Sequence, residues 1–267
     1  MYPELFHVHN TFFEFVMRSY TTCLVVAMGI AGYGVFRSVM KTGFNRKTTV
    51  ILTILTGISS IIGARVFHIL TNISQYQRNP PLMISFDFNG LSLIGAFIAT
   101  VIIGIVISKN TSRSIWKISD NAIVYIGIGI ALAKLGCFLH GCCFGTISNL
   151  PWAVSFPAFS QVHLYQMLHN ETNLLISRSV HPTQLYEAFG AFAGIVVALI
   201  MNRIIPALGI KTLVFIFVIT FIRILIHNVR VFPESFLPAE IYIQQLYAVI
   251  IALCMFAIWK INRGRNT

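Results

Sequence analysis

A single lysine interrupts an apolar segment near the middle of the chain. Lys134 follows the uncharged run Val124–Leu132 and lies in the stretch AKLGCFLHGCCFG, Ala133–Gly145. An ammonium at the centre of a bilayer costs about 2.5–3.5 kcal/mol on insertion scales. Because side chains held at that cost face a cavity or a counter-ion, we expect Lys134 to have an anionic partner.

Further cationic and titratable side chains lie within or beside other apolar segments. They are Arg65, Arg223, His140, His181 and His227. A guanidinium matches phosphate oxygens, so it can bind a phospholipid head group and stabilise a phosphate leaving group. An imidazole can accept a proton from an incoming nucleophile. The combination favours an enzyme that uses a phospholipid.

The run HPTQLYE, His181–Glu187, predicts the start of a helix, since proline suits the first helical turn. His181 then lies at the lip of the membrane, with Gln184, Tyr186 and Glu187 in the first turns. Glu187 precedes a long uncharged segment, so its carboxylate either compensates the helix dipole or pairs with a buried cation. We favour the ion pair.

Two other segments align polar side chains on one helical face. Arg223, His227 and Arg230 are spaced by four and three residues, which places all three on one face of a helix. Arg65 precedes His68 by three residues, on the face of another helix. The Arg65 side chain either joins a site or extends to the outer membrane surface.

Three of the five cysteines are close together: Cys137, Cys142 and Cys143. They could pack as small soft side chains, form a disulfide, carry a reactive thiol or bind a metal with His140. The spacing C-x₂-H-x-C-C is not a standard zinc pattern, and adjacent cysteines would make a strained disulfide. We therefore favour packing and predict no metal site.

The composition indicates which kind of structure carries these residues. The chain is 56% hydrophobic and 10% charged, against about 25% charged in soluble proteins. It therefore predicts a polytopic membrane protein, all-α, with about seven spans of roughly 20 residues. The spans are expected at Tyr20–Arg37, Val50–Ile73, Leu91–Ser108, Ala122–Leu139, Gln184–Met201, Leu213–Ile226 and Ile241–Trp259.

Twelve of the nineteen Lys and Arg residues then fall on one side of the membrane, four on the other and three within spans. By the positive-inside rule, the N-terminus is outside and the C-terminus cytoplasmic. The net charge of +11 is thus a topology signal, and no nucleic-acid partner is expected. Residues 1–267 form a single membrane domain, with an amphipathic interfacial arm over 1–19 and a small outer head over 140–181. The first residues lack the basic-then-apolar order of a cleavable signal peptide.

Several of these stretches, taken in order, resemble the prolipoprotein diacylglyceryl transferases. Ala133–Gly145 and the following run PWAVSFP, Pro151–Pro157, are similar to the core motif of that family. His181–Glu187 is similar to its H-P-[ST]-Q-L-Y-E, the most specific match. Weaker matches are Arg18–Tyr20, Gly63–Arg65, and Arg223 with Arg230.

The resemblance implies transfer of a diacylglyceryl group from phosphatidylglycerol to the lipobox cysteine of a prolipoprotein. It implies a multi-pass protein of the bacterial inner membrane and no metal or organic cofactor. Arg223 and Lys134 would hold the phosphate, while His181 and Glu187 would shape the catalytic entrance. The other residues expected to contact substrate are Tyr20, Arg65, Gln184, Tyr186, His140, Cys137 and Arg230.

The chain also departs from the family pattern. Ile94 occupies the position of a His or Tyr implicated in catalysis, and isoleucine cannot move protons. Lys134 replaces an arginine and so lacks its bidentate fork. The other replacements are Cys137 and His140 for asparagine, and Cys142 and His227 for glutamate. The cysteine form resembles a recurrent variant branch. Two alternatives stay open: a relative with the same phospholipid pocket and another acceptor, and a lipid-binding protein without catalysis.

Overall fold

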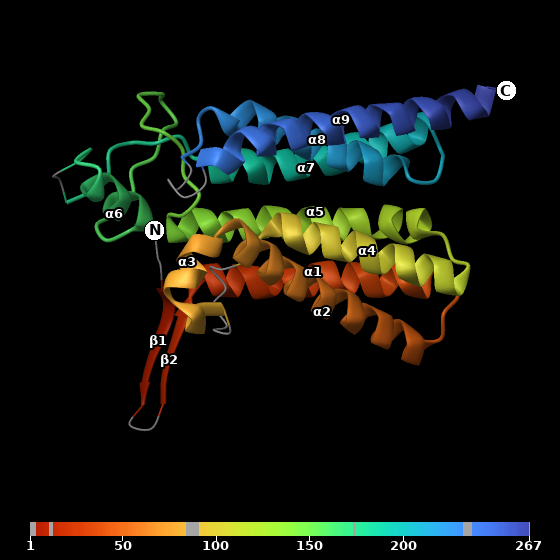
Figure 1. The fold of residues 1–267 in the computed structure, drawn as a ribbon, viewed down its shortest axis with the longest axis horizontal. Coiled ribbons are helices and arrows are strands. Elements are labelled where there is room, and N and C mark those ends of the chain that lie inside the picture. The colour runs from red at the N-terminus through yellow and green to blue at the C-terminus, as the bar shows by residue number, and fades with distance from the viewer. Residues whose placement is uncertain (1–3, 11–12, 84–90, 173–174, 232–236, 267) are drawn as a thin grey trace.

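The computed structural model describes residues 4–10, 13–83, 91–172, 175–231 and 237–266 (Figure 1). Within that part of the chain, seven helices are long and apolar enough to cross a membrane. They are α1 (Ser19–Met40), α2 (Arg46–Thr71), α4 (Leu93–Thr111), α5 (Ile115–His140), α7 (Thr183–Ile204), α8 (Ile210–His227) and α9 (Leu237–Asn266). The prediction of a polytopic all-α membrane protein is confirmed.

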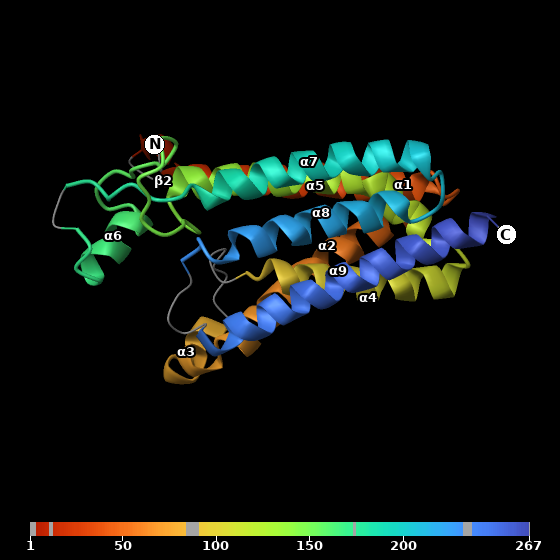
Figure 2. The same cartoon turned by 90° about the horizontal axis from the view of Figure 1, so that it is seen from above.

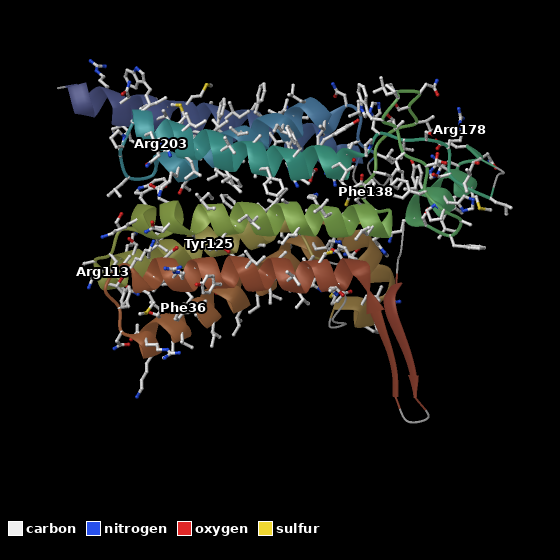
Figure 3. The ribbon with its side chains drawn as sticks, turned by 180° about the vertical axis from the view of Figure 1, so that it is seen from behind. Phe36, Arg113, Tyr125, Phe138, Arg178 and Arg203 are labelled. Carbon is white, nitrogen blue, oxygen red and sulfur yellow. The ribbon has the colours of Figure 1, made fainter. Side chains whose placement is uncertain are left out.

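Helix α5 is central to the bundle. It packs against α1 on one side and α7 on the other, while α2 pairs with α4 and α8 packs between α7 and α9 (Figures 1 and 2). The side chain of Tyr125 on α5 lies on the face turned towards α1, against Gly34 (Figure 3). The segment carrying Lys134 therefore runs between two layers of helices.

Glycines allow α1 and α5 to approach closely. A methyl group on Gly129 would come within 2.9 Å of the Ala27 carbonyl oxygen, and one on Gly136 within 2.7 Å of the Cys23 Cβ. Small residues at such positions let packed membrane helices come together. The close approach of α1 and α5 therefore depends on both glycines.

The chain before α1 forms an antiparallel hairpin of β1 (Glu4–Asn10) and β2 (Phe13–Arg18). Figure 1 shows the hairpin extending away from the helices at the end of the bundle where α6 and α3 (Ile73–Arg78) lie. A short 3-10 helix, η1 (Pro80–Met83), follows α3. The interfacial position of residues 1–19 stays a prediction; the described part of this segment, 4–10 and 13–18, forms the two paired strands.

The segment between α5 and α7 forms a small head around α6 (Gln161–Leu168). Its core consists of Phe144, Phe156, Val162 and Val180. Between Pro151 and Pro157, Val154 forms an isolated bridge with Val180. A proline at each end of this run limits continuation of a ladder, because proline donates no backbone hydrogen bond.

The described termini lie at opposite ends of the bundle. The N-terminal hairpin is at the end with the head, and the C-terminal end of α9 is at the other (Figure 1). An odd number of spans requires this arrangement, which agrees with the predicted topology of an outer N-terminus and a cytoplasmic C-terminus.

Helix α5 begins at Ile115, earlier than the expected Ala122, and so includes the acidic Asp120, which is buried inside the bundle. Its carboxylate accepts hydrogen bonds from the backbone N–H of Gly209 at 2.7 Å and of Thr212 at 2.9 Å, and from the Thr212 hydroxyl at 2.7 Å. It thus satisfies donors at the N-terminus of α8, where a negative charge is favourable.

Replacing Asp120 with alanine should leave these buried donors without their acceptor and lower the free energy of unfolding by about 1–3 kcal/mol. Thermal unfolding of the purified protein in detergent measures the change. Lys117→Ala, an exposed position on the same helix, is the matched control and should unfold as the unmodified chain does. Equal effects of the two substitutions would contradict the anchoring role of Asp120.

Candidate functional site

Three cations from separate parts of the chain meet at one buried carboxylate. Glu187 on α7 pairs with Lys134 Nζ from α5, with Arg223 Nη2 from α8 at 3.4 Å, and with Arg230 Nη1 from the segment after α8 at 2.5 Å. The Glu187 side chain is 5% exposed and that of Lys134 11%. The anionic partner expected for Lys134 is therefore Glu187, and the ion-pair interpretation of Glu187 is confirmed.

Among the described residues, positive side chains outnumber negative ones at this cluster. Lys134, Arg223 and Arg230 all face Glu187, three positive charges to one negative charge. Uncompensated charge is costly in a medium of low dielectric constant. An anion bound next to the cluster would reduce that cost, and a phosphate group has the charge and the acceptor oxygens to do so.

A pocket with apolar walls adjoins this cluster. This small pocket is lined by Glu187 and Arg223 together with Ile130, Gly190, Ile219 and Ile222. The polar lining consists of one carboxylate and one guanidinium, and the rest is aliphatic. Such a pocket suits a molecule that joins an anionic group to hydrocarbon.

Arg223 also reaches α9. Its Nη1 donates a hydrogen bond to the Tyr247 hydroxyl at 3.1 Å. Tyr247 was not among the residues predicted for the site. The polar residues Gln244 and Gln245 beside it, near the outer end of an otherwise apolar span, were the available signal.

The start of α7 holds the turn that follows α5. The Thr183 hydroxyl donates to the Cys143 carbonyl at 2.7 Å, and Gln184 Nε2 donates to the Cys142 carbonyl at 2.6 Å. Gln184 is fully buried, and its Oε1 has no hydrogen-bond partner among the described residues. The HPTQ run thus positions the core motif and leaves one buried acceptor beside it.

His181 and Tyr186 form a pair at the base of the head. The Tyr186 hydroxyl lies 3.3 Å from Nδ1 of His181 and accepts a hydrogen bond from Trp152 Nε1 at 2.8 Å. His181 also packs against Gly145, where an added methyl group would come within 2.6 Å of the His181 Cβ. Trp152 therefore orients the pair from the PWAVSFP run, a contact that the sequence did not predict.

Tyr20 and His140 form a second pair at the same end of α5. Their rings stack with centroids 5.5 Å apart, and Gln161 Nε2 lies 3.1 Å from His140 Nε2. Tyr20 thus contacts a predicted site residue, in addition to any role as an aromatic anchor at the interface.

Arg65 has different partners among the described residues. Its Nη2 donates to the Leu82 carbonyl at 2.5 Å, and its guanidinium lies over the Tyr76 ring, 5.5 Å from the centroid. These contacts connect Arg65 to the α3–η1 segment on the outer side. They favour the alternative in which Arg65 extends to the outer surface.

The predicted alignment of Arg223, His227 and Arg230 on one helix is wrong in part. Helix α8 ends at His227, and Arg230 follows in an isolated bridge with Gly145. Arg223 and Arg230 still converge, because both side chains contact Glu187. His227 is buried at the end of α8.

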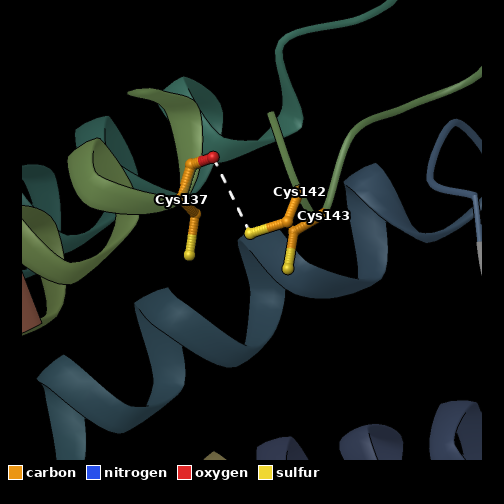
Figure 4. A group of neighbouring side chains, drawn as sticks. All are labelled: Cys137, Cys142 and Cys143. Carbon is orange, nitrogen blue, oxygen red and sulfur yellow. Dashed lines mark hydrogen bonds between the residues drawn. The ribbon is translucent and has the colours of Figure 1, made fainter. Parts of the chain in front are cut away.

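The three clustered cysteines lie beside these cations. Their sulfur atoms are all within 4.8 Å of one another (Figure 4). Hydrogen bonds from Cys137 and Cys142, followed by the positive charges of Lys134 and Arg230, hold the pKa of the Cys143 thiol below its ordinary value. The same sulfur contacts raise the pKa of Cys142, led by its contact with Cys137. The Cys143 thiol is therefore the most readily ionised of the three.

Comparison with known proteins agrees with this architecture. A family model described as prolipoprotein diacylglyceryl transferase matches residues 7–261. Relatives named phosphatidylglycerol–prolipoprotein diacylglyceryl transferase include one from Bacillus velezensis, 27% identical over 226 residues, which are 85% of this chain and 80% of the relative. A relative of the same name from Rhodopirellula baltica is 30% identical over 176 residues, 59% of this chain and 35% of the relative.

The match to the family model covers nearly the whole chain, and the described residues include seven helices that are long and apolar enough to cross a membrane. This multi-pass membrane protein belongs to the prolipoprotein diacylglyceryl transferase family.

Proposed function

We propose that this chain transfers a diacylglyceryl group from phosphatidylglycerol to the thiol of a lipobox cysteine in a prolipoprotein. The observation that carries the proposal is the convergence of three cations on Glu187 beside a pocket with aliphatic walls. The relatives named above have this activity in their names. Bacterial relatives and the membrane topology support a place in the bacterial inner membrane, with the site towards the outer face.

In this mechanism the phospholipid phosphate binds at the cation cluster. Lys134 and Arg223 contact the phosphate oxygens, and Arg230 adds positive charge from the outer side. The hydrocarbon of the lipid follows the walls formed by Ile130, Ile219 and Ile222. The glycerol carbon that carries the phosphate ester then lies between the charged and the apolar part of the pocket.

The acceptor sulfur attacks that glycerol carbon. A C–S bond forms, the C–O bond to the phosphate breaks, and glycerol phosphate leaves with the electron pair. Negative charge increases on the departing phosphate, so cations already in place stabilise the transition state more than the bound substrate. Glu187 holds those cations in position and limits their mutual repulsion.

The thiol proton needs an acceptor, and Ile94 cannot supply one. We assign this role to His181. When Nδ1 donates to the Tyr186 oxygen, Nε2 is left to accept a proton. Trp152 holds the tyrosine and so fixes the ring. Tyr20 and His140 stack on each other at the end of α5, and Gln184 holds the Cys142 carbonyl of the core motif from α7.

Two other functions predict different results in the same assay. A relative with a different acceptor would consume phosphatidylglycerol but leave a lipobox peptide unmodified. A lipid-binding protein without catalysis would form no product. Mass spectrometry of lipids and peptide after incubation with phosphatidylglycerol separates these alternatives.

Arg223→Ala should lower the rate of diacylglyceryl transfer about 100- to 1,000-fold, because one donor to the leaving phosphate is lost. Product is measured by mass spectrometry with phosphatidylglycerol and a lipobox peptide. Arg203→Ala, an exposed arginine at the opposite end of α7, is the matched control and should keep full activity. Full activity of a folded Arg223→Ala protein would exclude the proposed phosphate contact.

Glu187→Gln should destabilise the protein by about 3–5 kcal/mol, because the buried Lys134 and the partly buried Arg223 and Arg230 lose their counter-ion. Phosphatidylglycerol should restore more stability to this variant than to the unmodified protein, since its phosphate supplies negative charge. Thermal unfolding with phosphatidylglycerol, and with zwitterionic phosphatidylcholine for comparison, measures the difference. Glu171→Gln in the head serves as the control. Equal stabilisation of all three proteins by phosphatidylglycerol would argue against an anionic head group at this cluster.

His181→Ala should lower turnover about 100- to 10,000-fold, the range for loss of a general base, while phosphatidylglycerol still binds. Single-turnover transfer and lipid binding are measured separately. His169→Ala, which removes a histidine stacked on Tyr165 in the head, should leave both unchanged. A His181→Ala protein that loses lipid binding but keeps its turnover at saturation would assign His181 to binding instead of proton transfer.

A further inference from the structure

The three cysteines beside the cation cluster converge on one point. Cys137 lies in the last turn of α5, and Cys142 and Cys143 follow the helix cap, yet all three sulfur atoms lie within 4.8 Å of one another. Figure 4 shows the three side chains gathered between the end of α5 and the segment that follows it. General packing of small side chains would not require three thiols to meet in this way.

The backbone of the turn is built to hold this arrangement. Gly141 ends α5 with a φ of 76°, and Cys143 adopts a φ of 59°, in the left-handed region that non-glycine residues rarely occupy. Thr183 and Gln184 hold the carbonyl groups of Cys143 and Cys142 from α7. The Cys142 thiol lies 3.7 Å from the Cys137 carbonyl oxygen. A strained conformation fixed by a second helix is typical of a functional site.

A metal ion fits the geometry better than a disulfide does. Four ligands around zinc with Zn–S bonds of about 2.3 Å place sulfur atoms about 3.8 Å apart, so small rotations bring these thiols into range. A disulfide needs an S–S bond of about 2.05 Å, would use two of the three sulfurs, and is strained between adjacent cysteines.

The surrounding charge also fits a zinc–thiolate site. Lys134 lies one helical turn from Cys137 on α5, and Arg230 pairs with the same Glu187 carboxylate as Lys134. Three thiolates with one Zn²⁺ carry a net charge of −1, which these cations stabilise. The spacing C-x₂-H-x-C-C is not a standard zinc pattern, but this does not exclude a metal site. The third ligand, Cys143, is positioned by a left-handed turn that the spacing does not reveal.

We propose that Cys137, Cys142 and Cys143 bind one zinc ion as three thiolates and leave a fourth coordination position open. Binding releases the three thiol protons to solvent, and zinc does not change its oxidation state. Sites with three protein ligands and one open position are the catalytic form of zinc coordination, whereas four protein ligands close a structural site.

The open position would take the acceptor thiol, a role that rests on the proposed function. The acceptor loses its proton to His181 and binds zinc as a thiolate. The Zn–S bond then gives way as the sulfur forms its bond to the glycerol carbon and glycerol phosphate leaves. Zinc would thus activate the nucleophile in a chain where Ile94 stands at the position of a proton-carrying side chain.

Metal binding is tested with the purified full-length protein in detergent, reduced with a phosphine. Titration with Co²⁺ should give one equivalent of tetrahedral thiolate-bound cobalt by absorption, which Zn²⁺ displaces, and elemental analysis should find one zinc per chain. Replacement of all three cysteines by serine should abolish this uptake. The matched control, Cys23→Ser with Cys254→Ser, removes the other two cysteines and should bind as the unmodified protein does.

Unmodified reduced protein that takes up no more Co²⁺ than the triple serine variant would overturn the site. A disulfide among the three cysteines, together with no metal uptake after reduction, would overturn it as well. Because both outcomes are read on the unmodified chain, they do not depend on folding of the triple variant. Thermal unfolding with and without Zn²⁺ gives a second measurement, in which zinc should raise the midpoint of the unmodified protein and of the control.

The role of the ion is tested separately in the transfer assay. Removal of zinc by a chelator should lower transfer to the lipobox peptide at least about tenfold, and added Zn²⁺ should restore it. If zinc binds but does not affect transfer, its proposed role in activating the acceptor thiol is wrong, whereas the three-cysteine metal site stands. Failure of every form to transfer would overturn the proposed function and this role, while the titration would still decide the metal site.

Discussion

The structure depends on one buried carboxylate that serves three cations. Glu187 is the shared partner of Lys134, Arg223 and Arg230, which come from three separate segments. In the low dielectric of a helical bundle, none of these charges could be buried without the others. The ion pairs therefore join α5, α7 and the end of α8, and in the proposed function the three cations also attract the anionic head group of the lipid.

A second set of contacts couples the cluster to the core motif. The turn that contains the cysteines follows α5 directly, but its carbonyl groups are held by Thr183 and Gln184 at the start of α7. Glu187 lies on the next turn of the same helix. Helix α7 thus sets the positions of both the charged groups and the thiols. The proposed reaction needs this, because a phosphate and a sulfur must be held on either side of one carbon.

The opposite end of the bundle, where α8 begins, is stabilised by hydrogen bonds and apolar packing. Asp120 satisfies the start of α8, and the apolar cluster around Ile210 and Phe215 packs beside it. Helix α8 is therefore fixed at one end by a carboxylate that accepts backbone hydrogen bonds and at the other by ion pairs of Arg223. Both interactions use a carboxylate, Asp120 at one end of α8 and Glu187 at the other. Acidic residues are scarce in this chain, and these two each stabilise one end of the same helix.

The sequence alone determined the seven apolar spans, the charge asymmetry and the need for a counter-ion at Lys134, because membrane insertion depends on local hydropathy and charge. It also identified HPTQLYE and the core motif through their resemblance to a family. Only the tertiary structure decided that Glu187 is the common partner, that Arg230 reaches it from beyond the end of α8, and that Arg65 connects to Leu82 and Tyr76. The meeting of three sulfur atoms likewise depends on the left-handed backbone at Cys143. Contacts between distant segments follow from helix packing and turn geometry, which residue spacing along one segment does not encode.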